Sequence, residues 1–198
     1  VRLRLSAYGE SNDQSTRVEA EIERLKAIIG DIIYSYEDDT LENCIGKLLK
    51  AHGKTLSTAE SCTGGLIASM LTSVAGSSEY FLGTVVSYAN SVKEGVLGVS
   101  SEILKNHGAV SSECVGAMAE GVRRLTGSDF SVATSGIAGP GGGSEEKPVG
   151  LVWIAVSSQK GTETFKLQFN SDRKRNTERF ASSALYKILK KIEIELNS

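Results

Sequence analysis

The stretch that decides the fold is residues 55–71, TLSTAESCTGGLIASML. It predicts a short strand at 55–58, a turn over residues 59–65 and an apolar helix from Leu66. Outward from it, further strands are predicted at 81–88, 130–135, 149–157 and 163–169, and further helices at 91–97, 112–126 and 173–195. Strands that alternate with helices predict the α/β class, here a layered α/β/α domain with a mixed, mostly parallel sheet. The last two strands are expected to pair as a hairpin.

The first 37 residues predict a small N-terminal βαβ fragment. Residues 1–5 alternate apolar and charged side chains as a strand does, and residues 13–29 carry apolar side chains at helical spacing before Gly30. Residues 33–36 add a second short strand. This fragment is too small to bury a core alone.

The main domain is predicted at residues 38–198, where Thr40 can cap the first helix. Apolar residues make up 40% of the 198 residues, which is enough for the core of one ordinary domain. Because the chain begins with Val1 rather than methionine, we expect a fragment or a processed product.

Charge and hydropathy exclude several kinds of partner. The formal net charge is −2, and no basic block supplies the patch that nucleic-acid binding needs. No apolar run approaches the ~18 residues of a membrane span, and the N-terminus lacks a signal-peptide pattern. We therefore expect a cytoplasmic domain that binds neither nucleic acid nor membrane.

The cysteines and histidines argue against a metal site. Cys44, Cys62 and Cys114 are far apart, odd in number and without Cys-x-x-Cys pairing. His52 and His107 each precede a glycine, which predicts positions at the ends of helices. We predict neither a metal nor a cofactor.

The turn at 59–65 is the first candidate for chemistry. Ser61 stands between a strand and a helix, where unpaired backbone N–H groups meet the positive end of the helix dipole. A hydroxyl beside such donors suits acyl transfer, because it supplies both a nucleophile and a place for the oxyanion. The alternative from this motif alone is an ordinary capping serine. Cys62 is a rival nucleophile, although no histidine lies near it in sequence.

The second candidate is residues 87–93, SYANSVK. Tyr88 closes a predicted strand, and Asn90 or Ser91 can cap the next helix. Lys93 falls in the first turn of that helix, where the dipole opposes a cation and would help to lower the pKa of the amine. The alternative is a solvated surface lysine.

The third candidate is the loop at 135–148, SGIAGPGGGSEEKP, which holds both prolines of the chain. Its backbone N–H groups can converge on an anion, which suggests phosphate or ribose binding; a flexible connector is the alternative. The loop completes neither a Walker A motif nor a dinucleotide-binding fingerprint. Arg173, at the start of the last predicted helix, can bind a phosphate through its guanidinium or be plain surface charge.

Together these motifs resemble the competence/damage-inducible protein A C-terminal domain family over residues 40–195. The matching stretches are 58–65 (TAESCTGG), 76–78 (GSS), 87–90 (SYAN) with Lys93, 107–111 (HGAVS), 135–140 (SGIAGP), 142–150 (GGSEEKPVG) and 172–173 (DR). The resemblance implies Ser61 as the nucleophile, with Lys93 and Tyr88 as its activating pair. It also implies a substrate site formed by Glu60, Cys62, Thr63, Gly64, Gly65, Asn90, Ser135, Gly136, Ile137, Ala138, Gly139, Pro140, Gly141 and Arg173.

The activity that the resemblance implies is hydrolytic deamidation of nicotinamide mononucleotide to nicotinate mononucleotide and ammonia. Residues 1–37 resemble the end of a small linker domain in longer members. Those members also carry an N-terminal domain similar to molybdopterin-binding proteins, which is the one protein partner that the resemblance implies. Homo-oligomerisation is left open. Two alternatives to the deamidase are a serine or cysteine hydrolase of another amide or ester, and a non-catalytic nucleotide-binding or assembly module.

Overall fold

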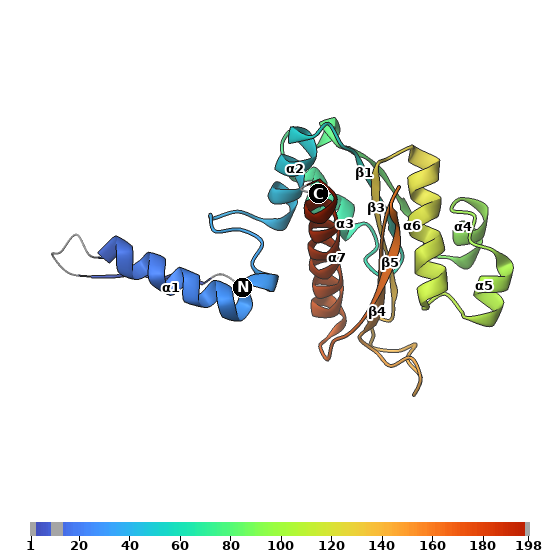
Figure 1. The fold of residues 1–198 in the computed structure, drawn as a ribbon. Coiled ribbons are helices and arrows are strands. Elements are labelled where there is room, and N and C mark those ends of the chain that lie inside the picture. The colour runs from blue at the N-terminus through green and yellow to red at the C-terminus, as the bar shows by residue number, and fades with distance from the viewer. Residues whose placement is uncertain (1–2, 9–13, 197–198) are drawn as a thin grey trace. The chain divides into compact units, whose positions relative to one another are not determined.

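The structure, a computed structural model, describes residues 3–8 and 14–196 of the chain. The chain forms two compact units, Val1–Asp39 and Thr40–Ser198 (Figure 1). The second unit contains the sheet and every residue of the candidate site.

The first unit is helical. Its elements are the helix α1 at Gln14–Ile29 and the 3-10 turn η1 at Gly30–Ile32. The prediction of a βαβ fragment is wrong, because residues 3–5 and 33–36 form no strand. Val1 and Arg2, also part of the first predicted strand, lie outside the described residues. A strand is stable only beside another strand, and none of the described residues of this unit is in a strand.

The second unit is built on one five-stranded mixed sheet in the order β2-β1-β3-β4-β5. Its strands are β1 Leu56–Glu60, β2 Phe81–Val86, β3 Phe130–Gly136, β4 Leu151–Ser158 and β5 Gly161–Gln168. β1 pairs in parallel with β2 and β3, whereas β4 pairs antiparallel with β3 and β5. The α/β class and the β4–β5 hairpin are confirmed. Half of the pairings are antiparallel, however, because neither connection of β4 contains a helix that could carry the chain back for a parallel pairing.

Helices cover both faces of this sheet (Figure 1). Their bounds are α2 Leu41–Ala51, α3 Leu66–Thr72, α4 Asn90–Gly95, α5 Ser101–Asn106, α6 Ser112–Thr126 and α7 Arg173–Leu196, with a 3-10 turn η2 at Ser77–Glu79. α6 packs on one face, while α3 and α7 pack on the other and α2 lies against α7. On α7, Phe180, Ala184 and Ile188 recur every fourth residue and are fully buried, so this stripe faces the core.

Local capping signals set several helix ends. The Thr40 side chain accepts a hydrogen bond from an amide in the first turn of α2, which confirms the predicted cap. His52 and His107 occupy the C-cap positions of α2 and α5. The glycine after each has a left-handed backbone, with φ of 59° at Gly53 and 75° at Gly108, so both predictions of a helix end are confirmed.

The carboxyl ends of the three parallel strands meet at one edge of the sheet. Glu60, the last residue of β1, lies beside Val86 of β2 and Thr134 of β3. The chain passes from β1 to β2 on one side, and β3 lies on the other side, so the connections diverge here. In open α/β sheets, ligands bind in the crevice outside the carboxyl ends of strands at such a point.

Candidate active site

Ser61 directly follows β1 and therefore lies at this edge. Its backbone N–H donates to the carbonyl oxygen of Thr134 (3.0 Å), which fixes the start of the turn. Its side-chain Oγ lies 3.2 Å from Nζ of Lys93, a residue 32 positions further along the chain. The fold, rather than local sequence, brings the hydroxyl and the amine together.

Lys93 is only 1% exposed, which is rare for lysine. Its ammonium donates to the carbonyl oxygens of Ser87 (2.6 Å) and Tyr88 (3.4 Å) as well as to Ser61 Oγ. Burial lowers the pKa of Lys93 below the ordinary value of 10.5, and two nearby cysteine thiols oppose this effect only in part. The amine is therefore easier to deprotonate than a surface lysine.

The helix that carries Lys93 differs from the prediction. Neither Asn90 nor Ser91 caps α4; its N-cap is Ala89, which makes no side-chain cap hydrogen bond. Lys93 is the fourth residue of this six-residue helix. Burial, and not a position in the first turn against a helix dipole, is the main cause of the lowered pKa.

Two of the three N–H directions of the Lys93 amine point to the carbonyls of Ser87 and Tyr88, and the third points to Ser61 Oγ. In the charged form that direction carries an N–H donated to Ser61 Oγ. In the neutral form, two N–H groups can stay on the carbonyls of Ser87 and Tyr88 while the lone pair faces the Ser61 hydroxyl. This geometry suits proton transfer from the serine to a neutral lysine.

Glu60 is fully buried, and its carboxylate is occupied by the turn that follows it. Oε2 accepts hydrogen bonds from the amides of Gly65 (2.9 Å) and Ile67 (3.1 Å), and Oε1 accepts one from Ala68 (2.8 Å). These amides lie at the start of α3, so Glu60 caps that helix from the preceding strand. The resemblance placed Glu60 in the substrate site, but in the structure it holds the turn that carries Ser61.

Two amides of this turn are left for an oxyanion. The Gly64 amide donates to the Ser61 carbonyl (3.2 Å), and the Gly65 amide is bound to Glu60. The amides of Cys62 and Thr63 find no oxygen acceptor among the residues that the structure describes. The amide directly after a nucleophile is a frequent oxyanion donor in acyl-transfer enzymes.

Cys62 is poorly suited to be the nucleophile. Its thiol is buried, and burial raises the pKa of Cys62 to about 12. Because the thiolate is the reactive form of cysteine, this side chain is almost unreactive at neutral pH. The environment favours a packing role for Cys62.

A cavity of about 280 Å³ opens beside Ser61 and Lys93. Its walls are formed by Ser61, Cys62, Tyr88, Asn90, Lys93, Ala109, Val110, Ser135, Gly136, Ile137, Ala138, Gly139, Gly141, Gly142 and Arg173. Of the residues that the resemblance implied, Glu60, Thr63, Gly64, Gly65 and Pro140 lie outside this lining. The expected substrate site omitted Ala109, Val110 and Gly142. All three fall in the stretches that carry the resemblance, and Ser135 Oγ donates to the Ala109 carbonyl (2.6 Å).

Arg173 joins two other segments of the cavity lining. Its guanidinium donates to the carbonyl of Gly139 (2.6 Å) and to the hydroxyl of Tyr88 (3.1 Å). The Tyr88 side chain is 64% exposed, and it is the Tyr88 carbonyl, not the hydroxyl, that contacts Lys93. The structure therefore brings the Tyr88 ring to Arg173.

Asn176, one turn further along α7, anchors the same loop from inside. It is fully buried, and its Nδ2 donates to the carbonyls of Ala138 (3.0 Å) and Ser171 (2.8 Å). Since Ala138 lines the cavity, the start of α7 sets the position of one cavity wall.

Two kinds of feature are absent from the described part of the chain. Within residues 3–8 and 14–196, no three His, Cys, Asp or Glu side chains come together as a possible metal site. In the same residues no helix is long and apolar enough to cross a bilayer. That the protein needs no cofactor and binds no nucleic acid remains a prediction.

Comparisons with known proteins agree with one another. The family model described as CinA C-terminal domain matches residues 38–192. A CinA-like protein of Cytophaga hutchinsonii is 45% identical over 177 residues, which are 89% of this chain and 42% of the relative. A CinA-like protein of Chloroherpeton thalassium is 48% identical over 190 residues, covering 93% of this chain and 45% of the relative. The chain thus spans less than half the length of these curated relatives.

Solved structures show the same fold. The competence/damage inducible protein CihA from Agrobacterium tumefaciens matches with a TM-score of 0.75 at 40% identity, over 77% of this chain and 93% of that chain. A competence-damaged protein (CinA) superfamily protein from Escherichia coli matches with a TM-score of 0.74 at 31% identity, over 81% of this chain and 96% of that chain. On the family model and these relatives, the chain belongs to the CinA C-terminal domain family.

Proposed function

We propose that this domain hydrolyses the carboxamide of nicotinamide mononucleotide, with Ser61 as nucleophile and Lys93 as its base. The observation that carries the proposal is the buried Lys93 amine, 3.2 Å from Ser61 Oγ and held by two carbonyls. A serine is activated by a neighbouring base, and a lysine can be that base only when its pKa is lowered. The nature of the amide rests on the family resemblance.

In the first step, neutral Lys93 takes the proton of the Ser61 hydroxyl while Oγ attacks the carboxamide carbon. The carbonyl oxygen becomes an oxyanion, which the amide of Cys62, the residue directly after Ser61, stabilises. Protonated Lys93 then gives its proton to the departing nitrogen, so that ammonia leaves and an acyl-serine remains. A water molecule, deprotonated by Lys93, cleaves this ester, and the Ser61 oxygen recovers a proton from Lys93. Nicotinate mononucleotide is released.

The part of the cavity lined by Arg173 is suited to the phosphoribosyl part of the substrate. Arg173 lines the cavity, and a guanidinium binds phosphate through paired N–H donors. The hydroxyl of Tyr88 and the carbonyl of Gly139 already hold this guanidinium in place. In this proposal Tyr88 acts chiefly through Arg173, and the proton of Ser61 passes directly to Lys93.

The proposal is tested by incubating the purified chain with nicotinamide mononucleotide and measuring ammonia and nicotinate mononucleotide together. Equal amounts of the two products are expected, and Ser61→Ala should reduce the rate at least ~10³-fold. Cys62→Ala should keep most of the activity, since its thiol is buried and protonated. Hydrolysis only of other amides or esters, or binding of the nucleotide without turnover, would overturn the proposal.

A further inference from the structure

A second and larger cavity lies at the opposite end of the sheet from Ser61. It has a volume of about 540 Å³. It opens between the last turn of α6 and the tip of the β4–β5 hairpin, and its walls are Glu120, Arg123, Arg124, Gly127, Ser128, Ser158, Gln159, Gly161 and Thr162. This volume is within the range of small-molecule sites, about 300–1,000 Å³. The proposed deamidation uses none of these residues.

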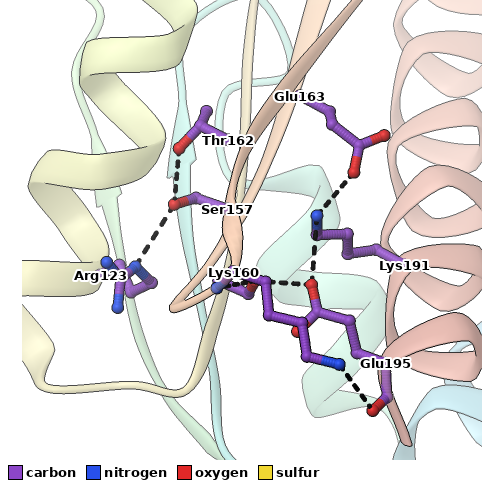
Figure 2. Close-up of polar contacts among 8 residues, drawn as sticks. Arg123, Ser157, Lys160, Thr162, Glu163, Lys191 and Glu195 are labelled. Atoms are coloured by element: carbon purple, nitrogen blue, oxygen red, sulfur yellow. Dashed lines mark hydrogen bonds and ion pairs between the residues drawn. The ribbon is translucent and has the colours of Figure 1, made fainter. Parts of the chain in front are cut away.

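Arg123 is fixed in this cavity by one edge of its guanidinium. Its Nε donates to Ser157 Oγ (3.3 Å), and Thr162 Oγ1 donates to the same oxygen (2.9 Å) (Figure 2). The two terminal nitrogens of Arg123 have no acceptor among residues 3–8 and 14–196. Arg123 is a half-buried residue whose guanidinium is oriented through Nε, so its two terminal nitrogens can bind an oxyanion.

Arg124, the next residue of α6, is an exposed second cation in the lining, and its guanidinium extends toward Gly98. Among the described residues, no carboxylate forms an ion pair with Arg123 or Arg124, although Lys54 and Lys191 pair with Asp129 and Glu163. Both arginines lie in the last turn of α6, where the helix dipole stabilises positive charge. The helix dipole therefore favours the two arginines at this end of α6, but it places no anion beside them in the cavity.

We propose that this cavity binds a phosphate-bearing anion. A guanidinium matches the oxygens of phosphate in pairs, so the terminal nitrogens of Arg123 can bind two of them, and the neighbouring charge of Arg124 adds to the positive potential. Glu120 is the one carboxylate in the lining, so the side chains of the wall carry a net positive charge. Free inorganic phosphate and the phosphate group of a larger metabolite share this chemistry, and the volume leaves room for either.

The test is a titration of the ¹⁵N-labelled full chain at low salt, because screening weakens such contacts. One arm uses inorganic phosphate and the other uses ribose 5-phosphate. The amide signals of Gly127, Ser128 and Gly161 are expected to shift with a saturable dependence. The variant with Arg123→Met and Arg124→Met should lower the affinity at least tenfold, while Arg17→Met, an exposed arginine in the first unit, should not.

A third variant separates this site from the proposed catalytic one. Arg173→Ala should leave the shifts at Gly127 and Gly161 unchanged, whatever it does to turnover. Tighter binding of ribose 5-phosphate would identify a phosphorylated metabolite, and equal affinity would identify the phosphate group alone; either supports the site. Absence of shifts in both arms, or equal affinity in the double arginine variant, would overturn it.

Discussion

Two lysines on different helices are nearly buried, and their surroundings are opposite. Lys93 has two carbonyls and one hydroxyl around its Nζ. Lys191, with a side chain 10% exposed, has the carboxylates of Glu163 at 2.6 Å and Glu195 at 3.1 Å (Figure 2). Burial lowers the pKa of Lys93. At Lys191 burial also acts to lower the pKa, but the two carboxylates outweigh it and the pKa is raised.

The difference shows that burial alone does not make a lysine a base. A carboxylate neighbour keeps the amine charged, whereas neutral acceptors bind its protons without compensating the charge. Lys191 therefore stabilises the contact between α7 and the β4–β5 hairpin. Charged Lys93 lowers stability, because its three oxygen partners are neutral and do not offset the cost of burying the charge.

The largest expected effect is that of Lys93→Met. Turnover should fall about 10²–10⁴-fold, the usual contribution of a general base. The melting temperature should rise, because methionine avoids the cost of burying an uncompensated charge. Turnover is measured as ammonia release, and stability by thermal unfolding.

Lys191→Met is the matched control. It should leave turnover within about twofold and lower stability by about 1–3 kcal/mol, between the values for exposed and buried ion pairs. The raised pKa implies that the stability from Lys191 is present below the ordinary value of 10.5 and is lost as pH rises through the folded-state pKa. If both variants lose stability and keep turnover, Lys93 is a structural lysine and the comparison fails.

Arg173→Ala is expected to have the next largest effect. Removing a charge-assisted contact of about 1.5–3 kcal/mol should raise KM about 10–150-fold and change kcat little. Tyr88→Phe removes only the hydroxyl that accepts from Arg173, so it should raise KM less and leave kcat nearly unchanged. A large fall of kcat in Tyr88→Phe would instead place Tyr88 in the proton path between Ser61 and Lys93.

Glu60→Gln sharpens the comparison at the turn. An amide group cannot accept on its NH₂ side, so at least one amide among Gly65, Ile67 and Ala68 loses its acceptor. We expect a loss of about 1–3 kcal/mol in stability and roughly a tenfold fall in kcat, because the Ser61 turn moves. Glu79→Gln, which affects an exposed pair with Lys50, should change stability by no more than about 0.5 kcal/mol and leave kcat nearly unchanged. Equal effects of the two substitutions would show that Glu60 does not position Ser61.

Local patterns predicted much of this molecule from the sequence alone. The cap at Thr40 depends on neighbouring residues and is where the sequence placed it. The strand before Ser61 was also predicted, but it runs over Leu56–Glu60 and so includes Ala59 and Glu60, which the prediction assigned to the turn. The strand predicted at residues 1–5 is absent from residues 3–5, because alternation in the sequence does not supply the neighbouring strand that such a segment needs. The end of the short helix α5 was predicted at His107, but its start after the cap Ser100 was not, because six residues are too few to show a helical period.

In the candidate site, too, residues with a local sequence motif could be predicted, whereas contacts between distant segments could not. Ser61 and Lys93 could be singled out from their motifs, but their contact spans 32 residues and needs the fold. The contact of Arg173 with Tyr88 spans 85 residues and has no local signal. The role of Glu60 could not be predicted either. The same sequence allows a carboxylate before a turn to contact a ligand or to accept from backbone amides of the turn, as Glu60 does.

The smallest expected effect is that of chelation. The proposed nucleophile and base are the side chains of Ser61 and Lys93, and neither step of the reaction needs a Lewis acid. Exhaustive dialysis against EDTA should therefore leave kcat and KM within error of the untreated enzyme. Loss of activity that one added metal restores would contradict the serine mechanism.

The most direct measurement of the central claim is the dependence of kcat/KM on pH. Since burial lowers the pKa of Lys93 and only the neutral amine can accept a proton, kcat/KM should rise with pH along a limb centred below the ordinary 10.5. Lys93→Arg should lose nearly all activity together with this limb, because a guanidinium keeps its proton. A wild-type limb centred at the ordinary lysine value, or a Lys93→Arg enzyme with normal turnover, would contradict the assignment of Lys93 as the base that activates Ser61.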